Sequence, residues 1–184
     1  MNLNIYNFHK FHPLIIIQIN RITINYYSIK NIKLIPIIWQ LILTNEGSLT
    51  KVLNSLTRKK LKIKMLQKCN YKSQTINRNI RCVWLETSIY TKLIFARSLW
   101  LLTYQMKINF EIIINKPIGK SFIDNQIDIY KNINEIYYGY CKYFEKNFST
   151  NHAIWGRKYT LYYNYTNYIT IQEFFSPYIL NLFN

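Results

Sequence analysis

The sequence predicts an α+β domain built on a single antiparallel β-sheet, and three observations lead to this fold class. Segments 80–87 and 92–100 alternate apolar with polar residues and are rich in β-branched and aromatic types, which favours strands. The connections between such segments are short enough for hairpins. Segment 48–57, in contrast, has the spacing and the cap of a helix. Strands joined by hairpins and interrupted by helices are typical of an antiparallel α+β domain.

The chain contains no internal repeat and no Pro-, Gly- or Ser-rich linker, so residues 33–184 are predicted to form one domain. Residues 1–32 are set apart as an N-terminal extension of uncertain structure. Within this extension, the residues after Ile17 (Ile19, Ile22 and Ile24) alternate more like a strand than like a signal sequence.

The first elements of the domain are a short buried segment, 36–44, and a capped helix, 48–57. Ser48 has the hydroxyl that an N-cap uses to accept an amide hydrogen bond. The apolar residues on one face of this helix are Leu49, Val52, Leu53 and Leu56.

Strands are predicted next at 61–67, and then at 80–87 and 92–100 around a turn at Ser88–Thr91. Segment 104–114 fits a helix or a strand equally well. Pro117 and Gly119 then punctuate the chain.

The last third of the chain is predicted to hold one long helix and one hairpin. Segment 159–175 has a turn at Asn164–Asn167 between two alternating halves. Segment 126–147 carries apolar residues at helical spacing, namely Ile129, Ile133, Ile136, Tyr137, Tyr140 and Phe144.

The composition excludes a disordered chain, because 49% of the residues are hydrophobic and 17% are aromatic. A formal net charge of +16 points to a polyanion partner. However, the chain is rich in Asn, Ile, Lys, Tyr and Phe, whose codons are rich in A and T, as expected of an organellar genome. The densest basic cluster, 58–64, alternates with apolar residues like the solvent face of a strand. We therefore attribute the charge to codon bias and expect no nucleic-acid partner.

Neither a metal site nor a membrane span is predicted. The cysteines and histidines lie far apart, without the paired spacing of metal ligands or of a disulfide framework. The apolar run at 35–43 is too short to cross a bilayer.

Two ionisable residues interrupt apolar strand faces. Arg81 shares its face with two aliphatic residues, and Glu173 shares its face with three apolar residues. If these faces form the core, each charge needs a partner or a ligand. Two simpler interpretations stay open: Arg81 and Glu173 pair with each other, or the opposite faces, with Cys82 and Trp84, point inward.

Several short motifs follow one another in a defined order. They are Gly47-Ser48-Leu49-Thr50, Arg81-Cys82-Val83-Trp84-Leu85, Phe95-Ala96-Arg97, Pro117-Ile118-Gly119, Trp155-Gly156-Arg157-Lys158 and Glu173-Phe174-Phe175-Ser176-Pro177. This series resembles the chorismate lyase family, in particular its members encoded in plastid genomes. The resemblance extends from about Trp39 to Pro177.

The resemblance implies a fold and a site. The fold is one antiparallel sheet with helices and helical flaps over a buried ligand pocket. The implied catalytic residues are Arg81, which holds a ring carboxylate, and Glu173, which meets the ring hydroxyl. An alignment without a gap would put Glu86 in place of Arg81; we prefer Arg81 because a loop insertion is tolerated and a reversed charge is not.

The resemblance also implies secondary contacts. The backbones of Leu49 and Ile118 would touch the ligand, and Arg97 matches an arginine that lies near the site in the family. The motif Trp155-Gly156-Arg157-Lys158 also has a counterpart in the family, but we expect it to be a turn that packs its tryptophan before a strand, with exposed cations, and not a catalytic element.

The implied activity is loss of pyruvate from chorismate to give 4-hydroxybenzoate, without a metal or organic cofactor. The ligand would be an aromatic carboxylate, the protein a monomer in the plastid, and the product a precursor for quinone synthesis. Two alternatives remain open: a small-molecule-binding module of the same fold without turnover, and a basic organellar RNA- or ribosome-binding protein.

Overall fold

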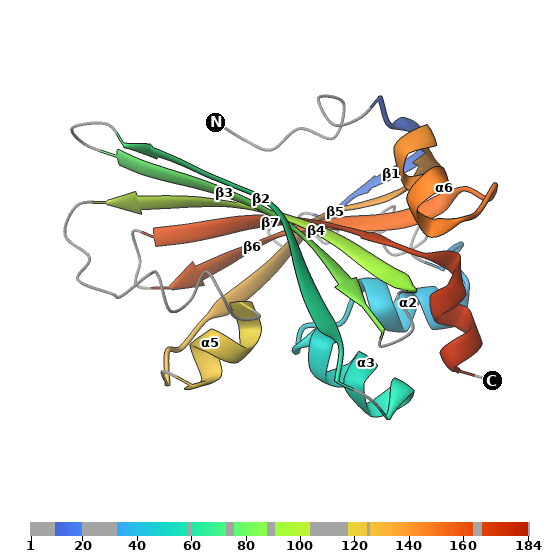
Figure 1. The fold of residues 1–184 in the computed structure, drawn as a ribbon, viewed down its shortest axis with the longest axis horizontal. Helices are drawn as coiled ribbons and strands as arrows, with labels where there is room; N and C mark the ends of the chain where they lie inside the picture. Colours follow the sequence, from blue (N-terminus) through green and yellow to red (C-terminus); the bar gives the residue numbers. More distant parts are fainter. Residues whose placement is uncertain are drawn as a thin grey trace.

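The described strands of the protein form one antiparallel sheet in the order β1-β5-β6-β7-β4-β3-β2 (Figure 1). The computed structural model describes residues 10–19, 33–58, 60–72, 76–87, 91–103, 118–124, 126–163 and 167–183. The strands are β1 (His12–Gln18), β2 (Lys62–Lys72), β3 (Ile76–Glu86), β4 (Lys92–Thr103), β5 (Tyr130–Tyr140), β6 (Ile154–Tyr163) and β7 (Asn167–Phe175). The helices are α2 (Ile37–Leu43), α3 (Leu49–Thr57), α5 (Ile118–Asp124), α6 (Lys142–Phe148) and the 3-10 helix η2 (Pro177–Leu182). The α+β class with a single antiparallel sheet is thus confirmed.

The sheet carries a separate hydrophobic cluster on each of its two faces. On one face, Trp84, Phe95 and Phe174 pack with Phe144 and Phe148 of α6; we call this the aromatic face. The other face is covered by α2, α3 and α5, on the opposite side of the sheet from α6 (Figure 1). We call it the cavity face, because the site described below lies on it.

The helix at 48–57 forms as the sequence predicts, and the strands of both predicted hairpins pair; residues 88–90 and 164–166 of the predicted turns lie outside the described residues. Ser48 caps α3 by accepting a hydrogen bond from the Lys51 amide at 3.4 Å. Strands β3 and β4 pair throughout, as do β6 and β7. Segment 36–44 is the short helix α2, which buries Trp39 and leaves Ile37 exposed.

The prediction of one helix over 126–147 is wrong. This segment forms strand β5 and then the short helix α6. A bulge between Ile133 and Glu135 adds one residue to the strand. As a result, Ile133 and Ile136 both face the same hydrophobic cluster although they are three residues apart. Three-residue spacing imitates a helix, and the bulge that causes it is invisible in the sequence.

Strand β1 lies within the segment that the sequence analysis set apart as an extension. It pairs with β5 and forms one edge of the sheet. Segment 104–114, predicted as helix or strand, lies outside the described residues. Within the described residues, no helix is both long and apolar enough to cross a membrane.

Candidate active site

A cavity of about 250 Å³ lies between the cavity face and the segments at the starts of α3 and α5. Its walls are mainly aliphatic. The charged residues that line it are Glu46, Arg81, Lys131, Arg157 and Glu173. Among the residues that the structure describes, no three His, Cys, Asp or Glu side chains are placed to hold a metal ion.

Arg81 lies on β3 and lines the cavity together with Val83 and Leu85. Only 3% of its surface is exposed, and burial lowers the pKa of its guanidinium to about 10. Glu86, the residue of the alignment without a gap, is not among the residues that line the cavity.

Glu173 lies on β7 and is 7% exposed at the cavity wall. Both of its carboxylate oxygens accept hydrogen bonds: Oε2 from Arg157 Nε at 2.8 Å, and Oε1 from the Tyr159 hydroxyl at 2.9 Å. The ion-pair partner of Glu173 is therefore Arg157, and the interpretation that Arg81 and Glu173 pair with each other is wrong.

Arg157 is fully buried, so the prediction of an exposed cation at this position is wrong. It lies opposite Glu173 in the register of β6 and β7. Its Nη1 also donates to the carbonyl oxygens of Ile42, Leu43 and Asn45, at 2.9, 3.1 and 3.0 Å. The last carbonyls of a helix lack partners within it, and Arg157 supplies donors to those of α2. One side chain thus connects the sheet, Glu173 and the segment that leads to α3.

Tyr159 is the second residue that donates a hydrogen bond to Glu173, and together with Arg157 and Glu173 it forms the polar end of the cavity. Burial first, and then the charge of Glu173, raise the pKa of its phenol well above the usual value. Its hydroxyl therefore keeps its proton at neutral pH and remains a hydrogen-bond donor to Glu173.

Lys131 is a charged residue of the cavity that the sequence analysis missed. Its Nζ donates to the Asn45 carbonyl at 2.9 Å and lies 4.2 Å from the ring centroid of Tyr159. Burial, followed by the nearby charge of Arg157, lowers the pKa of this ammonium to about 7. Had segment 126–147 been read as a strand, Lys131 would have been noticed as a cation between Ile129 and Ile133.

The two segments proposed for backbone contacts lie side by side at the cavity. Leu49 and Ile118 both line it. A Cβ atom added at Gly119 would be 3.5 Å from the Ser48 hydroxyl oxygen. The first turns of α3 and α5 therefore approach each other closely.

Arg97, the third residue predicted to contact the ligand, is not among the described residues that line the cavity. It stands opposite Cys82 on β3 and Gln172 on β7. Cys82 belongs to the aromatic cluster, so Arg97 is on the aromatic face, whereas its neighbours Ala96 and Ser98 line the cavity.

The structure is an α+β domain with a small cavity, lined by both apolar and charged residues, against one face of an antiparallel sheet. Residues 43–183 match the family model described as chorismate pyruvate-lyase Rv2949c-like. The chain belongs to this family.

The chain also resembles curated proteins that carry the name "Uncharacterized protein ycf21". It is 43% identical over 175 residues to the one from Antithamnion sp., covering 95% of each chain. It is 36% identical over 151 residues to that of Porphyra purpurea, covering 80% of this chain and 85% of the relative. Over 153 residues it is 33% identical to that of Cyanophora paradoxa, covering 77% and 78%. The designation ycf21 is used for plastid-encoded genes.

Proposed function

We propose that the protein is a lyase that binds chorismate in this cavity and eliminates pyruvate to leave 4-hydroxybenzoate. Membership of a chorismate pyruvate-lyase family supports the reaction class. The observation that carries the proposal is the composition of the cavity: a buried guanidinium, Arg81, and a buried carboxylate, Glu173, both line a cavity whose walls are mainly aliphatic.

Arg81 is proposed to hold the ring carboxylate of the ligand. Its burial makes the charge costly, as its lowered pKa indicates, and an anionic ligand would offset this cost. A guanidinium also matches a carboxylate in shape, because two parallel N–H groups meet two oxygens.

Glu173 is proposed to accept a hydrogen bond from the ring hydroxyl. Arg157 and Tyr159 each occupy one direction of approach to its carboxylate, and a carboxylate has about four lone-pair directions. The same two bonds fix the carboxylate in place, so that it orients the ring without first reorganising.

The backbones of Leu49 and Ile118 are proposed to close the cavity over the ligand. Both belong to first turns of short helices, where amide groups lack helical partners. Together with the aliphatic walls they would exclude water, and in dry surroundings the charges of Arg81 and Glu173 act more strongly on the substrate.

In the reaction the C–O bond to the enolpyruvyl group and the C–H bond at the hydroxyl-bearing ring carbon both break; the ring becomes aromatic, and the enolpyruvate gains a proton at its methylene carbon to become pyruvate. The task of the protein is therefore to hold the reactive conformer and to stabilise the charge that develops on the leaving group. We propose no cofactor for this step. The plastid gene name of the relatives supports a plastid location, where 4-hydroxybenzoate would feed quinone synthesis, and we propose that the protein acts as a monomer.

The proposal is tested by incubating the purified protein with chorismate from pH 6 to 9, with and without a chelator, and separating the products by chromatography. We expect 4-hydroxybenzoate to form at the same rate in both. Chorismate that is bound but recovered intact would contradict the lyase and indicate a binding module.

A further inference from the structure

Among the described residues, three cations and two anions line the cavity. The charge of Arg157 is balanced by Glu173, at an N–O distance of 2.8 Å. Glu46 also lines the cavity and acts on Lys131, but it is exposed, so water weakens the interaction of its carboxylate. Arg81 and Lys131 are thus two buried or half-buried cations of the cavity beyond this pair.

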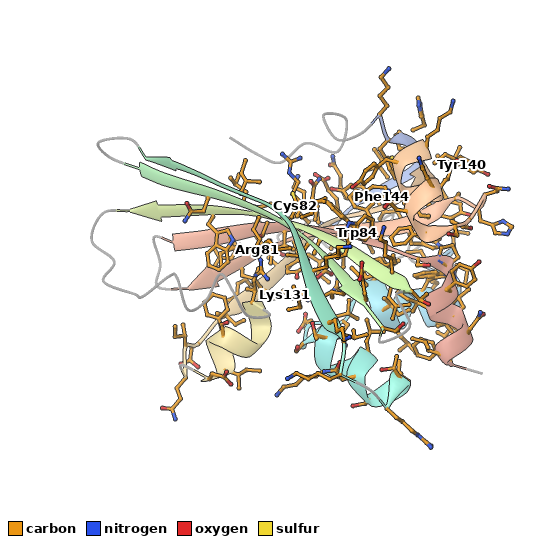
Figure 2. The ribbon with its side chains drawn as sticks, in the orientation of Figure 1. Arg81, Cys82, Trp84, Lys131, Tyr140 and Phe144 are labelled. Atoms are coloured by element: carbon orange, nitrogen blue, oxygen red, sulfur yellow. The ribbon has the colours of Figure 1, made fainter. Side chains whose placement is uncertain are left out.

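These two cations approach the cavity from opposite sides. Arg81 is on β3 and Lys131 on β5, with β4, β7 and β6 between them. Four strand spacings correspond to about 19 Å between backbones in a flat sheet. Both side chains are long, and Lys131 Nζ reaches back over the ring of Tyr159 on β6. In Figure 2 both residues lie on the side of the sheet that α3 and α5 cover. A ligand that meets both cations must carry two separated acidic groups.

We propose that Lys131 forms a second anion subsite, which binds the carboxylate of the enolpyruvyl group while Arg81 binds the ring carboxylate. This inference rests on the proposed function, because chorismate carries its two carboxylates on the ring and on the substituent meta to it. The hydroxyl at the next ring position would then meet Glu173, whose partners Arg157 and Tyr159 both lie near Lys131.

The local geometry allows Lys131 to take up this role without losing its present bond. An ammonium has three donors, and the bond to the Asn45 carbonyl uses one of them. Arg157 Nη2 is a further buried donor, and it has no hydrogen-bond partner among the described residues. Both donors are at the end of the cavity where the leaving group would lie.

The subsite has a consequence for specificity. The product, 4-hydroxybenzoate, keeps the ring carboxylate but has lost the second one, so it forfeits the contact with Lys131. Lys131 therefore favours a dicarboxylate over a monocarboxylate, whereas Arg81 serves both.

Isothermal titration calorimetry at pH 6.5 tests this with two probes, 4-hydroxybenzoate and the dicarboxylate 3-(carboxymethoxy)benzoate. We expect Lys131→Met to weaken binding of the dicarboxylate at least about tenfold, and of 4-hydroxybenzoate less than about threefold. Lys131→Arg keeps the charge and should retain most of the preference. Circular dichroism checks the fold, and Lys131→Gln replaces the methionine variant if that one does not fold.

Lys92→Met is the matched control. The Lys92 ammonium also lies over an aromatic ring, 4.8 Å from the ring centroid of Trp84, and it donates a hydrogen bond to Oδ1 of Asn147. It belongs to the aromatic face, so its removal should change neither affinity.

Three outcomes would overturn the subsite. An unchanged dicarboxylate affinity in Lys131→Met would remove Lys131 from binding. An equal loss for both probes would show a general role in the shape of the cavity. Failure of the wild-type protein to bind either probe would contradict the proposed function as well, so the two failures are distinguishable.

Discussion

Arg157 and Glu173 lie opposite each other on β6 and β7, and their side chains form a buried ion pair with an N–O distance of 2.8 Å. The same arginine donates to carbonyl oxygens at the end of α2. The pair therefore joins the floor of the cavity to the segment that leads into α3. It fixes the carboxylate on which the proposed chemistry depends.

Replacing Arg157 by Met should destabilise the protein by about 3–5 kcal/mol, because Glu173 would be left as a buried charge without its cation. Urea unfolding, followed by tryptophan fluorescence, measures this loss. The double variant Arg157→Met/Glu173→Leu should lose less than the sum of the single variants, with a coupling of about 1–3 kcal/mol. Additive losses would mean that the two side chains act independently.

Replacing Arg81 by Met should keep the fold but abolish most binding of 4-hydroxybenzoate, at least about tenfold, because the carboxylate loses its charge-assisted bonds. Calorimetry measures the affinity. Glu86→Gln is the control, since Glu86 does not line the cavity, and it should bind as the wild type does. Loss of binding in Glu86→Gln with retention in Arg81→Met would favour the alignment without a gap.

Replacing Gly156 by Ala should lower stability by about 1–3 kcal/mol, as overpacking does in a dense core. An added Cβ would be 2.8 Å from the Glu173 carbonyl oxygen and 2.8 Å from the Phe174 ring, closer than such contacts allow. Thermal unfolding measures the change. Gly47→Ala is the control, since the nearest atom to its added Cβ is 3.7 Å away. Equal melting temperatures for the two variants would show that β6 and β7 separate easily.

The features that could be predicted from the sequence are local. The cap at Ser48 and the β3–β4 pairing depend on residues close together in the chain, whose pattern is visible in the sequence. Arg81 and Glu173 were noticed because each interrupts an apolar alternation, and both line the cavity.

The remaining features depend on register and on long-range contacts. The residues next to Arg157 in the sequence do not indicate that its ion-pair partner lies on β7. They also do not indicate that its guanidinium donates hydrogen bonds to carbonyl oxygens of α2. The bulge between Ile133 and Glu135 changed the apparent period and hid Lys131 in a predicted helix. Arg97 was placed by similarity of motif, but the register of β4 with β3 puts it on the aromatic face.

Replacing Lys131 by Met should raise the melting temperature, and by more at low pH than at high pH. The pKa of Lys131 is about 7 in the folded protein because of burial and Arg157, with Glu173 and Glu46 opposing, against about 10.4 in the unfolded chain. Because the folded protein binds this proton less tightly than the unfolded chain does, the charge of Lys131 lowers the free energy of unfolding. This loss is absent above about pH 10.4, grows as the pH falls towards about 7 and is constant below that.

Differential scanning fluorimetry of Lys131→Met and wild type at pH 6.5 and pH 10 measures this difference. We expect a clear rise in the melting temperature of Lys131→Met over the wild type at pH 6.5, and a much smaller rise at pH 10. Lys131→Arg keeps its charge at both values and should show no such gain. An equal gain at both pH values would show that packing, not the charge of Lys131, causes the effect.

The cavity that contains Arg81 and Glu173 is proposed to convert chorismate to 4-hydroxybenzoate and pyruvate. This proposal is tested most directly by a single-turnover measurement with enzyme in excess over chorismate, so that even a slow first turnover is detected. We predict pyruvate and 4-hydroxybenzoate in equal amounts from the wild type, and at least about a hundredfold slower release from Glu173→Gln, which keeps the shape and loses the charge. Chorismate left intact by the folded wild-type protein would contradict the proposed lyase activity, and equal rates in both proteins would remove Glu173 from the reaction.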